Sequence, residues 1–179
     1  MSLDYAALWV LVIVNSLGIL VLTRQLAMAP QYSRRSGPKV GSTVGAWSLE
    51  TLDGAVRRST DPPDAYTLLF VSSTCGPCHA LFTELRAAGR PRGLLYIVAQ
   101  GDAAALAKEA TSEQGPLYDL LLVDGGGEVQ KSLQVPGTPY AVAIARGRVE
   151  AAAVASTPDQ LSRICVTVAG PGEREPSTA

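Results

Sequence analysis

Apolar and polar residues alternate from residue 46 onward in the pattern of one α/β domain. Short apolar runs rich in strand-forming residues are too brief for helices and long enough for buried strands. The predicted strands are residues 65–73, 93–100, 118–125 and two more within 139–155, the last two folded at Arg146-Gly147-Arg148. Amphipathic segments predict helices from Cys75 to Gly89, over 102–110, over 127–135 as a helix or turn, and from Thr157 onward.

Local signals support these boundaries. Asp53-Gly54 lies inside an alternating segment and predicts an opening β-hairpin. Asp102 and Thr157 are favourable N-cap residues, and Pro158 suits the first helical position. The order of elements predicts a mixed β-sheet flanked by helices on both faces, in which reactive sites gather at the carboxyl ends of strands.

The beginning of the chain holds an uncharged, mostly apolar run, Tyr5–Thr23, bracketed by Asp4 and Arg24. Its length is about one bilayer crossing, for which a helix needs roughly 20 residues. Residues 1–28 are therefore predicted to form a single transmembrane anchor. A buried core helix and a signal peptide cleaved at Ala27-Met28-Ala29 are the alternatives. The run exceeds the usual signal-peptide core and no Lys or Arg precedes it, which favours a retained anchor.

The rest of the chain divides by composition. Residues 29–45 are rich in Pro, Gly, Ser and Thr without an apolar period, which predicts a flexible tether. Residues 46–169 carry the α/β pattern, and residues 170–179 are expected to be a disordered tail.

Composition narrows the function classes. The formal net charge is −1 and no long block of like charges occurs, so we expect no nucleic-acid partner. The chain has 3 cysteines, too few for a disulfide-stapled scaffold. Two of them form the unit Cys75-Gly76-Pro77-Cys78, a spacing that indicates chemistry.

This cysteine pair lies at the junction between a predicted buried strand and the predicted helix that follows it. The unpaired N–H groups and the dipole of a helix N-terminus favour an anion, so Cys75 is the expected nucleophilic thiolate. Cys78, one turn deeper, can attack a mixed disulfide formed by Cys75. Pro77 is tolerated in the first turn, and His79 is expected to be partly exposed and to tune the thiols electrostatically.

A second segment completes the predicted site. Thr138-Pro139 precedes a strand and suits a cis peptide, because X–Pro bonds adopt cis at a cost of only about 0.5–1 kcal/mol. A cis bond there would turn the backbone of Thr138 outward, where it could pair with an extended polypeptide.

Two other interpretations start from the same residues. Cys75, Cys78 and His79 satisfy the C-x-x-C-H motif of covalent haem attachment, but this motif ends a strand and opens an amphipathic helix. Structural zinc would want four ligands, and beyond these three only Cys165 remains. Cys165 shares a predicted apolar helix face with Leu161 and Ile164, so no metal is expected.

The segments "TLLFVSSTCGPC" and "GTPY", followed by a hairpin and a terminal helix, resemble the thioredoxin fold. With the anchor and tether, the chain resembles more narrowly the membrane-tethered TlpA/ResA group and its methylamine-utilisation, MauD-like branch. The resemblance implies Cys75 as attacking thiol, Cys78 as resolving thiol and Pro139 as the cis-proline. It also implies substrate contacts at Gly76, Pro77, Thr138 and Pro139. One position departs from the pattern: where thioredoxins carry a buried acid, six residues before the first cysteine, this chain has Leu69.

We therefore expect a membrane-tethered thiol–disulfide oxidoreductase that acts on cysteine-containing exported proteins and is recycled by a membrane redox partner. Its only cofactor would be the Cys75–Cys78 disulfide. The alternative is a thioredoxin-fold binding or assembly factor without significant redox turnover, which the missing acid at Leu69 would suit.

Orientation rests on two opposed arguments. Arg24, Arg34, Arg35 and Lys39 follow the apolar run and by themselves favour a cytoplasmic domain. Long domains cross membranes largely regardless of such charges, and disulfides persist outside the cytosol. We expect a single-pass protein of the cell membrane with its domain on the extracytoplasmic side.

Overall fold

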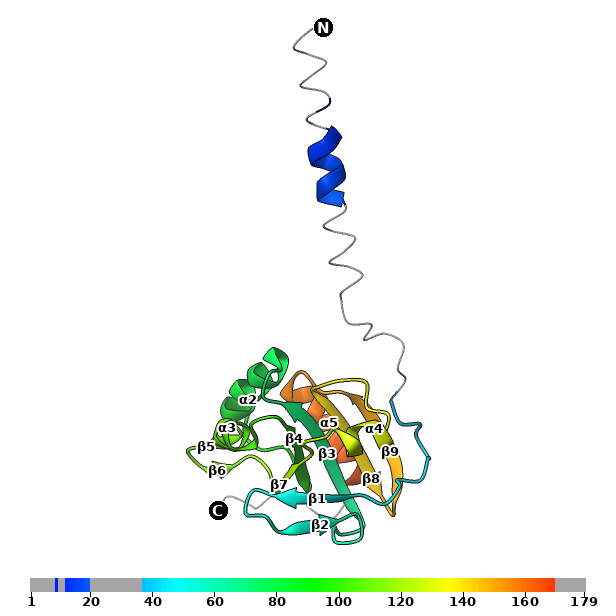
Figure 1. Ribbon diagram of the computed structural model, residues 1–179. Helices are drawn as coiled ribbons and strands as arrows, with labels where there is room; N and C mark the ends of the chain where they lie inside the picture. The colour runs from blue at the N-terminus through cyan, green and yellow to red at the C-terminus, as the bar shows by residue number, and fades with distance from the viewer. Residues whose placement is uncertain (1–8, 10–11, 20–36, 170–179) are drawn as a thin grey trace, which may run out of the picture. The chain divides into compact units, whose positions relative to one another are not determined.

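Strand β3 (Ala65–Ser72) lies inside the sheet, between β4 (Leu95–Gln100), which runs parallel to it, and β8 (Tyr140–Ala145), which runs antiparallel. The computed structural model describes residue 9 and residues 12–19 and 37–169. Within these residues the main sheet has seven strands in the order β2-β1-β7-β4-β3-β8-β9 (Figure 1). Its other strands are β1 (Ser48–Thr51), β2 (Val56–Arg58), β7 (Leu120–Val123) and β9 (Arg148–Val154). The mixed α/β fold predicted from the sequence is confirmed.

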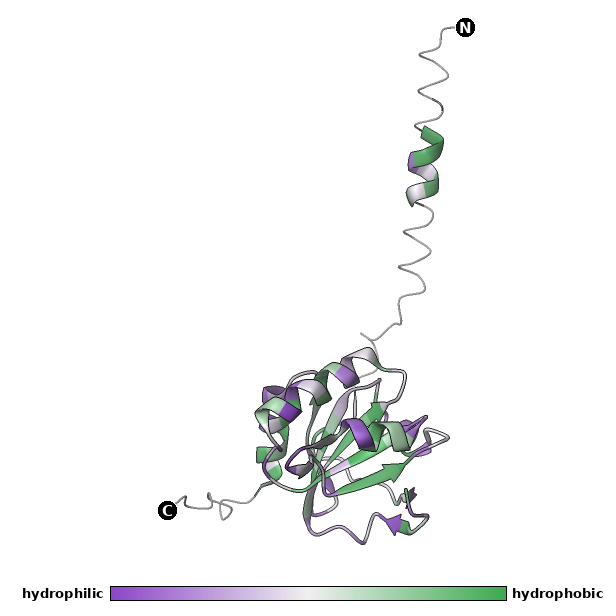
Figure 2. Ribbon diagram, turned by 90° about the vertical axis from the view of Figure 1, so that its left-hand side faces the viewer, coloured by the Kyte–Doolittle hydropathy of each residue, from purple (hydrophilic) through white to green (hydrophobic). Residues whose placement is uncertain are grey.

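Alternate residues of β3 face two apolar layers, because successive side chains of a strand point to opposite sides. Leu69 and Val71 pack with the buried faces of three helices, and Leu68 and Phe70 pack on the other face. The three helices are α2 (Gly76–Ala88), α3 (Ala103–Glu109) and α5 (Pro158–Val168). Figure 2 shows largely hydrophobic strands covered by helices that also carry hydrophilic positions.

The second face is covered by shorter elements. Val129 of α4 (Glu128–Ser132) contributes to this layer, as do Leu133, Val135 and Trp47 from the segments beside the sheet. Helices therefore lie on both faces, as predicted, but the face with α2, α3 and α5 is covered far more heavily. Cys78 is buried in that heavily covered face, and Cys75 packs against it.

The turn and the helix N-caps predicted from the sequence are present in the structure. The hairpin at Asp53-Gly54 joins β1 to β2. The Asp102 carboxylate accepts the N–H of Ala105 at 3.0 Å, and the Thr157 hydroxyl accepts the N–H of Gln160 at 3.3 Å. One small element was not predicted: β5 (Thr111–Ser112) pairs with β6 (Gly115–Pro116). Strands of two residues carry no alternation that a sequence pattern could reveal.

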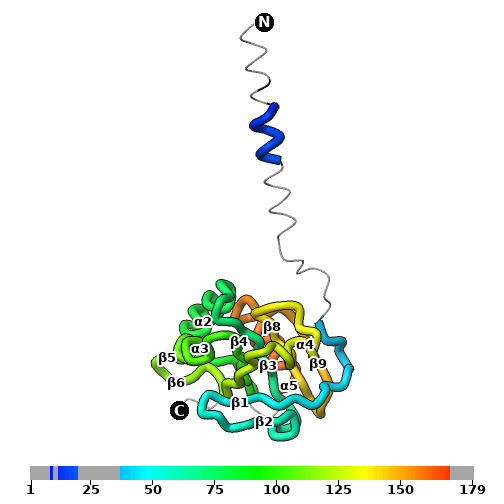
Figure 3. The backbone as a smooth tube through the Cα atoms, in the orientation of Figure 1, coloured from blue at the N-terminus to red at the C-terminus, as the bar shows by residue number. Residues whose placement is uncertain are grey.

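Part of the predicted tether belongs to the domain. The N–H of Gly41 donates to the Val149 carbonyl at 2.7 Å, and the N–H of Val44 donates to the Gly147 carbonyl at 2.9 Å. Residues 37–45 run beside β9 (Figure 3). The hydrogen-bonded domain therefore starts before residue 46, which corrects that boundary. The sequence pattern missed it because these contacts are mainly backbone hydrogen bonds, to which Val44 adds a partly buried side chain packed against the core. Residues 29–36 and the predicted tail 170–179 lie outside the described residues.

The chain divides into two units, Met1–Arg34 and Arg35–Ala179. In the first, residues 9 and 12–19 are helical and exposed. None of the helices among the described residues has the length and apolar character needed to cross a membrane. The predicted anchor over 1–28 lies for the most part outside the described residues.

Candidate active site

Cys75 and Cys78 stand at the junction of β3 and α2, at the carboxyl end of a buried strand. They are joined by a disulfide, and their Cα atoms are 5.3 Å apart. Cys75 is the N-cap residue of α2, and its Sγ accepts the N–H of Cys78 at 3.2 Å. The sulfur of Cys75 therefore takes the place of the capping oxygen that usually satisfies a first-turn N–H group.

The two cysteines differ in exposure. Cys78 is completely buried, packed with Leu81 and Leu69 in the core of the heavily covered face, whereas Cys75 is only partly buried. Gly76 and Pro77 between them are exposed. The side of the disulfide that carries Cys75 is thus open to solvent, while Cys78 is shielded from solvent.

The loop at Thr138 comes to the disulfide from a distant part of the chain. Phe70 near the end of β3 pairs with Tyr140 at the start of β8, so the residues before β8 lie beside the start of α2. Sγ of Cys75 lies 3.4 Å from the carbonyl oxygen of Thr138, which accepts a hydrogen bond from that sulfur when it is a thiol. The Thr138-Pro139 bond is cis, as the sequence predicted. The carbonyl of Thr138 thus faces Cys75; pairing of this segment with a substrate stays a prediction.

His79, in the first turn of α2, is partly exposed as expected. Its Nδ1 lies 2.5 Å from Oε2 of Glu109, and its Nε2 lies 3.1 Å from the carbonyl oxygen of Ser73. The hydrogen bond to Glu109 is the main cause that raises the pKa of His79 above its usual value, with partial burial opposing it. No sequence pattern pointed to Glu109, because it lies at the end of a different helix, thirty residues further along the chain.

The remaining sequence candidates lie in the core. Leu69 is fully buried, so the position of the thioredoxin acid is occupied here by a packed apolar side chain. Cys165 of α5 is a free, buried thiol, and burial raises its pKa. It is not gathered with Cys75, Cys78 and His79: among residues 9, 12–19 and 37–169, no three His, Cys, Asp or Glu side chains form a group that could hold a metal.

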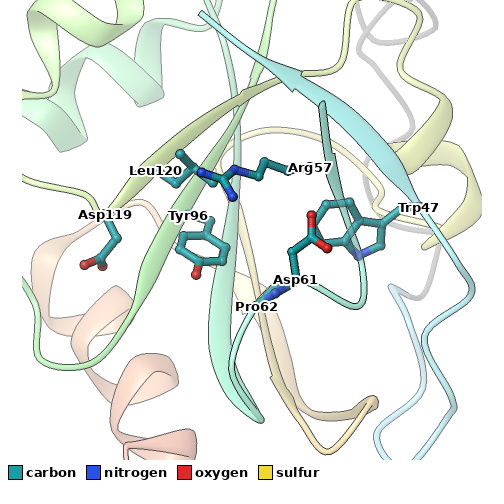
Figure 4. Close-up of a pocket in the computed structure, with 7 residues that line it drawn as sticks. All are labelled: Trp47, Arg57, Asp61, Pro62, Tyr96, Asp119 and Leu120. Carbon is teal, nitrogen blue, oxygen red and sulfur yellow. The ribbon is translucent and has the colours of Figure 1, made fainter. Parts of the chain in front are cut away.

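A separate cleft of about 230 Å³ lies at the other end of the parallel strands (Figure 4). Asp119 and Leu120 border it where β7 begins, whereas the disulfide lies where β3 ends. The cleft is lined by Trp47, Arg57, Asp61, Pro62, Tyr96, Asp119 and Leu120. It contains no thiol, and both of its carboxylates already bind groups of the protein: Asp61 accepts the N–H of Arg58, and Asp119 that of Leu95. We therefore place the candidate site at the disulfide.

The chain is similar to known proteins in structure. No protein-family model and no curated protein sequence matches the chain. A thiol:disulfide interchange protein DsbE from Chlorobium tepidum is similar in structure, with a TM-score of 0.58 and 21% identity over 74% of this chain and 99% of that protein. A secreted Mycobacterium tuberculosis disulfide oxidoreductase homologous to E. coli DsbE gives a TM-score of 0.53 and 21% identity over 67% and 94%. StoA from Bacillus subtilis gives 0.50 and 17% over 67% and 96%. The domain thus has the thioredoxin-like fold of these proteins.

Proposed function

We propose that this protein is a thiol–disulfide oxidoreductase that works through Cys75 and Cys78. One observation carries the proposal: a partly exposed sulfur caps the N-terminus of α2, is bonded to a buried sulfur one turn along, and faces the Thr138 carbonyl of the cis-proline loop. The similarity to solved disulfide oxidoreductases supports this use of the fold.

The exchange follows from the difference in exposure between the two sulfurs. In the reducing direction, the Cys75 thiolate attacks one sulfur of a substrate disulfide, forms a mixed disulfide and releases the other substrate sulfur as a thiolate. The Cys78 thiolate then attacks Sγ of Cys75, restores the Cys75–Cys78 disulfide and releases the second substrate thiolate. Two electrons pass from the protein dithiol to the substrate disulfide, and the reverse sequence oxidises a substrate dithiol.

Helix α2 supplies the electrostatic part of this chemistry. In the reduced protein the Cys75 thiolate occupies the position of its present sulfur, where the Cys78 N–H and the helix dipole stabilise negative charge. Leu69 occupies the position of the buried acid, so no carboxylate there can accept the proton of the Cys78 thiol. That proton must pass to water or to another group near Cys75. This difference from thioredoxin affects the rate at which Cys78 resolves the mixed disulfide, but it does not change which cysteine is the nucleophile.

The proposal extends to place and partners. We assign the protein to the membrane-tethered TlpA/ResA type, with the MauD-like branch as the narrower hypothesis. Residues 5–23 would be the anchor, and the domain would face the extracytoplasmic side. Cysteine-containing exported proteins would be its substrates, and a membrane redox partner would recycle the dithiol. A reporter enzyme active only outside the cytoplasm, fused after Ala179, tests the placement: no reporter activity with normal expression would refute it.

Insulin reduction with dithiothreitol as electron donor tests the chemistry directly. Cys75→Ser is expected to reduce turnover to the uncatalysed rate, because it removes the nucleophile. Cys165→Ala is the matched control, since it removes a cysteine that is buried away from the disulfide. Equal activity in wild type and Cys75→Ser would instead favour the binding or assembly role.

Cys78→Ser tests the order of the two sulfurs. Without the resolving thiol, the Cys75 mixed disulfide cannot be cleared, so the variant should accumulate a covalent complex with a disulfide-containing substrate that reducing agent releases. A complex that accumulates in Cys75→Ser and not in Cys78→Ser would reverse the assignment.

A further inference from the structure

The ring of His79 lies between two hydrogen-bond acceptors. Its Nδ1 faces Oε2 of Glu109 at 2.5 Å and its Nε2 faces the Ser73 carbonyl oxygen at 3.1 Å. A carbonyl oxygen cannot donate, and an ionised carboxylate cannot either. A neutral imidazole carries one N–H and could satisfy only one of them, whereas an imidazolium carries two. When the two groups share one proton, it resides on the ring, because imidazole is a stronger base than a carboxylate.

The bridge connects three pieces of the site. Ser73 follows β3 and precedes Cys75 by two residues, His79 lies in the first turn of α2, and Glu109 ends α3. Ser73 is also held from the other side, since its hydroxyl accepts the N–H of Asp102 at 3.0 Å. The backbone N–H of His79 itself donates to the Cys75 carbonyl at 3.3 Å. The loop that carries Cys75 is therefore clamped between α2 and α3, with His79 as the link.

We propose that His79 is a positioning residue of the dithiol site: as an imidazolium bonded to Glu109 and to the Ser73 carbonyl, it fixes the loop that presents Cys75 and places positive charge beside the reduced dithiol. This inference rests on the proposed function for its meaning, but it concerns a protonation state and a reactivity that are measurable without substrate.

The charged groups near the His79 ring come from α2 and α3. Glu109 reaches it from α3, and Arg86 of α2 donates to the Glu109 carbonyl oxygen at 3.2 Å. The loop over residues 73–75 contributes no charge unless Cys75 is reduced and ionised to its thiolate. The hydrogen bond to Glu109 raises the pKa of His79. The bridge is therefore complete below the ordinary pKa of histidine and is lost as pH rises through the raised value. Above it, one of the two contacts breaks and the positive charge disappears.

The chain has 1 histidine, so its NMR signals are assigned without ambiguity. In the full-length reduced protein, nitrogen-15 imidazole spectra should show both ring nitrogens protonated at pH 6 and a titration midpoint above the usual value of about 6.5. Glu109→Gln should lower that midpoint. Glu113→Gln, which removes an exposed carboxylate of the adjoining β5–β6 turn, is the matched control and should leave it unchanged. A neutral single tautomer at pH 6, or a midpoint that Glu109→Gln does not move, would overturn the proposal.

The second readout is the alkylation rate of Cys75 against pH in the reduced protein, with Cys165→Ala as background. The wild-type profile should contain an inflection at the His79 midpoint besides that of the thiol. His79→Asn should remove this inflection and lower the rate at pH 6 by about two- to fivefold, the order expected for loss of one nearby, partly neutralised charge. Superimposable profiles would contradict the proposal. If His79→Asn does not fold, Glu109→Gln still tests the inference through the NMR midpoint. If the NMR midpoint and the alkylation profile both give the expected results but insulin is not reduced, the proposed function is refuted and the inference about His79 is supported.

Discussion

Replacing Leu69 by aspartate places a carboxyl group where thioredoxins have one, six residues before Cys75. In this protein the site is built for an apolar side chain: Leu69 is 0% exposed and packs with Cys78 and Leu81. Its sheet neighbours are Ile97 and Ala141, neither of which can donate a side-chain hydrogen bond. Leu69→Asp should therefore destabilise the domain strongly, and more strongly at higher pH.

The magnitude has two parts. Loss of a fully buried leucine side chain costs about 2–3 kcal/mol. A carboxyl group in so apolar a site has its pKa raised by about three units or more. The folded state then holds its proton while the unfolded state releases it above about pH 3.9, so stability falls by about 1.4 kcal/mol per pH unit. At pH 7 this second part reaches about 4 kcal/mol, and the two parts together take much of the roughly 5–15 kcal/mol that stabilises a typical domain.

Urea unfolding of Leu69→Asp and Leu69→Asn at pH 5 and pH 7.5 separates the two parts. Both variants lose the leucine and gain a polar group of similar size, but only the aspartate titrates. The gap between their free energies of unfolding should widen by about 3 kcal/mol between the two pH values. A gap that stays constant would mean that the introduced carboxyl group reaches water or a partner, and the argument that Leu69 sits in a sealed apolar site would be refuted.

Three further predictions use the same domain. In the folded, reduced protein iodoacetamide should label the partly exposed Cys75 quickly and the buried Cys78 slowly, and should label Cys165, whose pKa is raised by burial, only after unfolding; three equally fast thiols in a mass spectrum would contradict this. Asp124→Ala should cost about 2–4 kcal/mol in urea unfolding, because the buried carboxylate accepts the N–H groups of Glu128 at 2.8 Å and Gln130 at 3.0 Å; Asp124→Asn should cost less, since one acceptor remains. Thr157→Ala should cost about 1 kcal/mol through the lost N-cap and Thr157→Ser almost nothing, and equal losses would show that the hydroxyl does not cap α5.

Local patterns were sufficient for most of the fold. The runs that became β3, β4 and β8 were predicted from apolar content and length, because a buried strand must be apolar on both faces. Asp102 and Thr157 marked two helix starts through caps that act within three residues. The cysteine pair and the Thr138-Pro139 turn could be found for the same reason, since each depends on adjacent residues.

Contacts between distant segments were decided by the tertiary structure. The carbonyl of Thr138 meets Cys75 only because β8 pairs with β3 in one register. The pairing of His79 with Glu109 requires α2 and α3 to lie side by side. The sequence pattern of neither helix predicts that it packs against the other. Residues 41–44 join the edge of β9 through backbone groups that every residue possesses. A sequence pattern reports the environment of each residue, buried or exposed, but the identity of its distant partner depends on strand register and helix packing, which arise only when the whole chain folds.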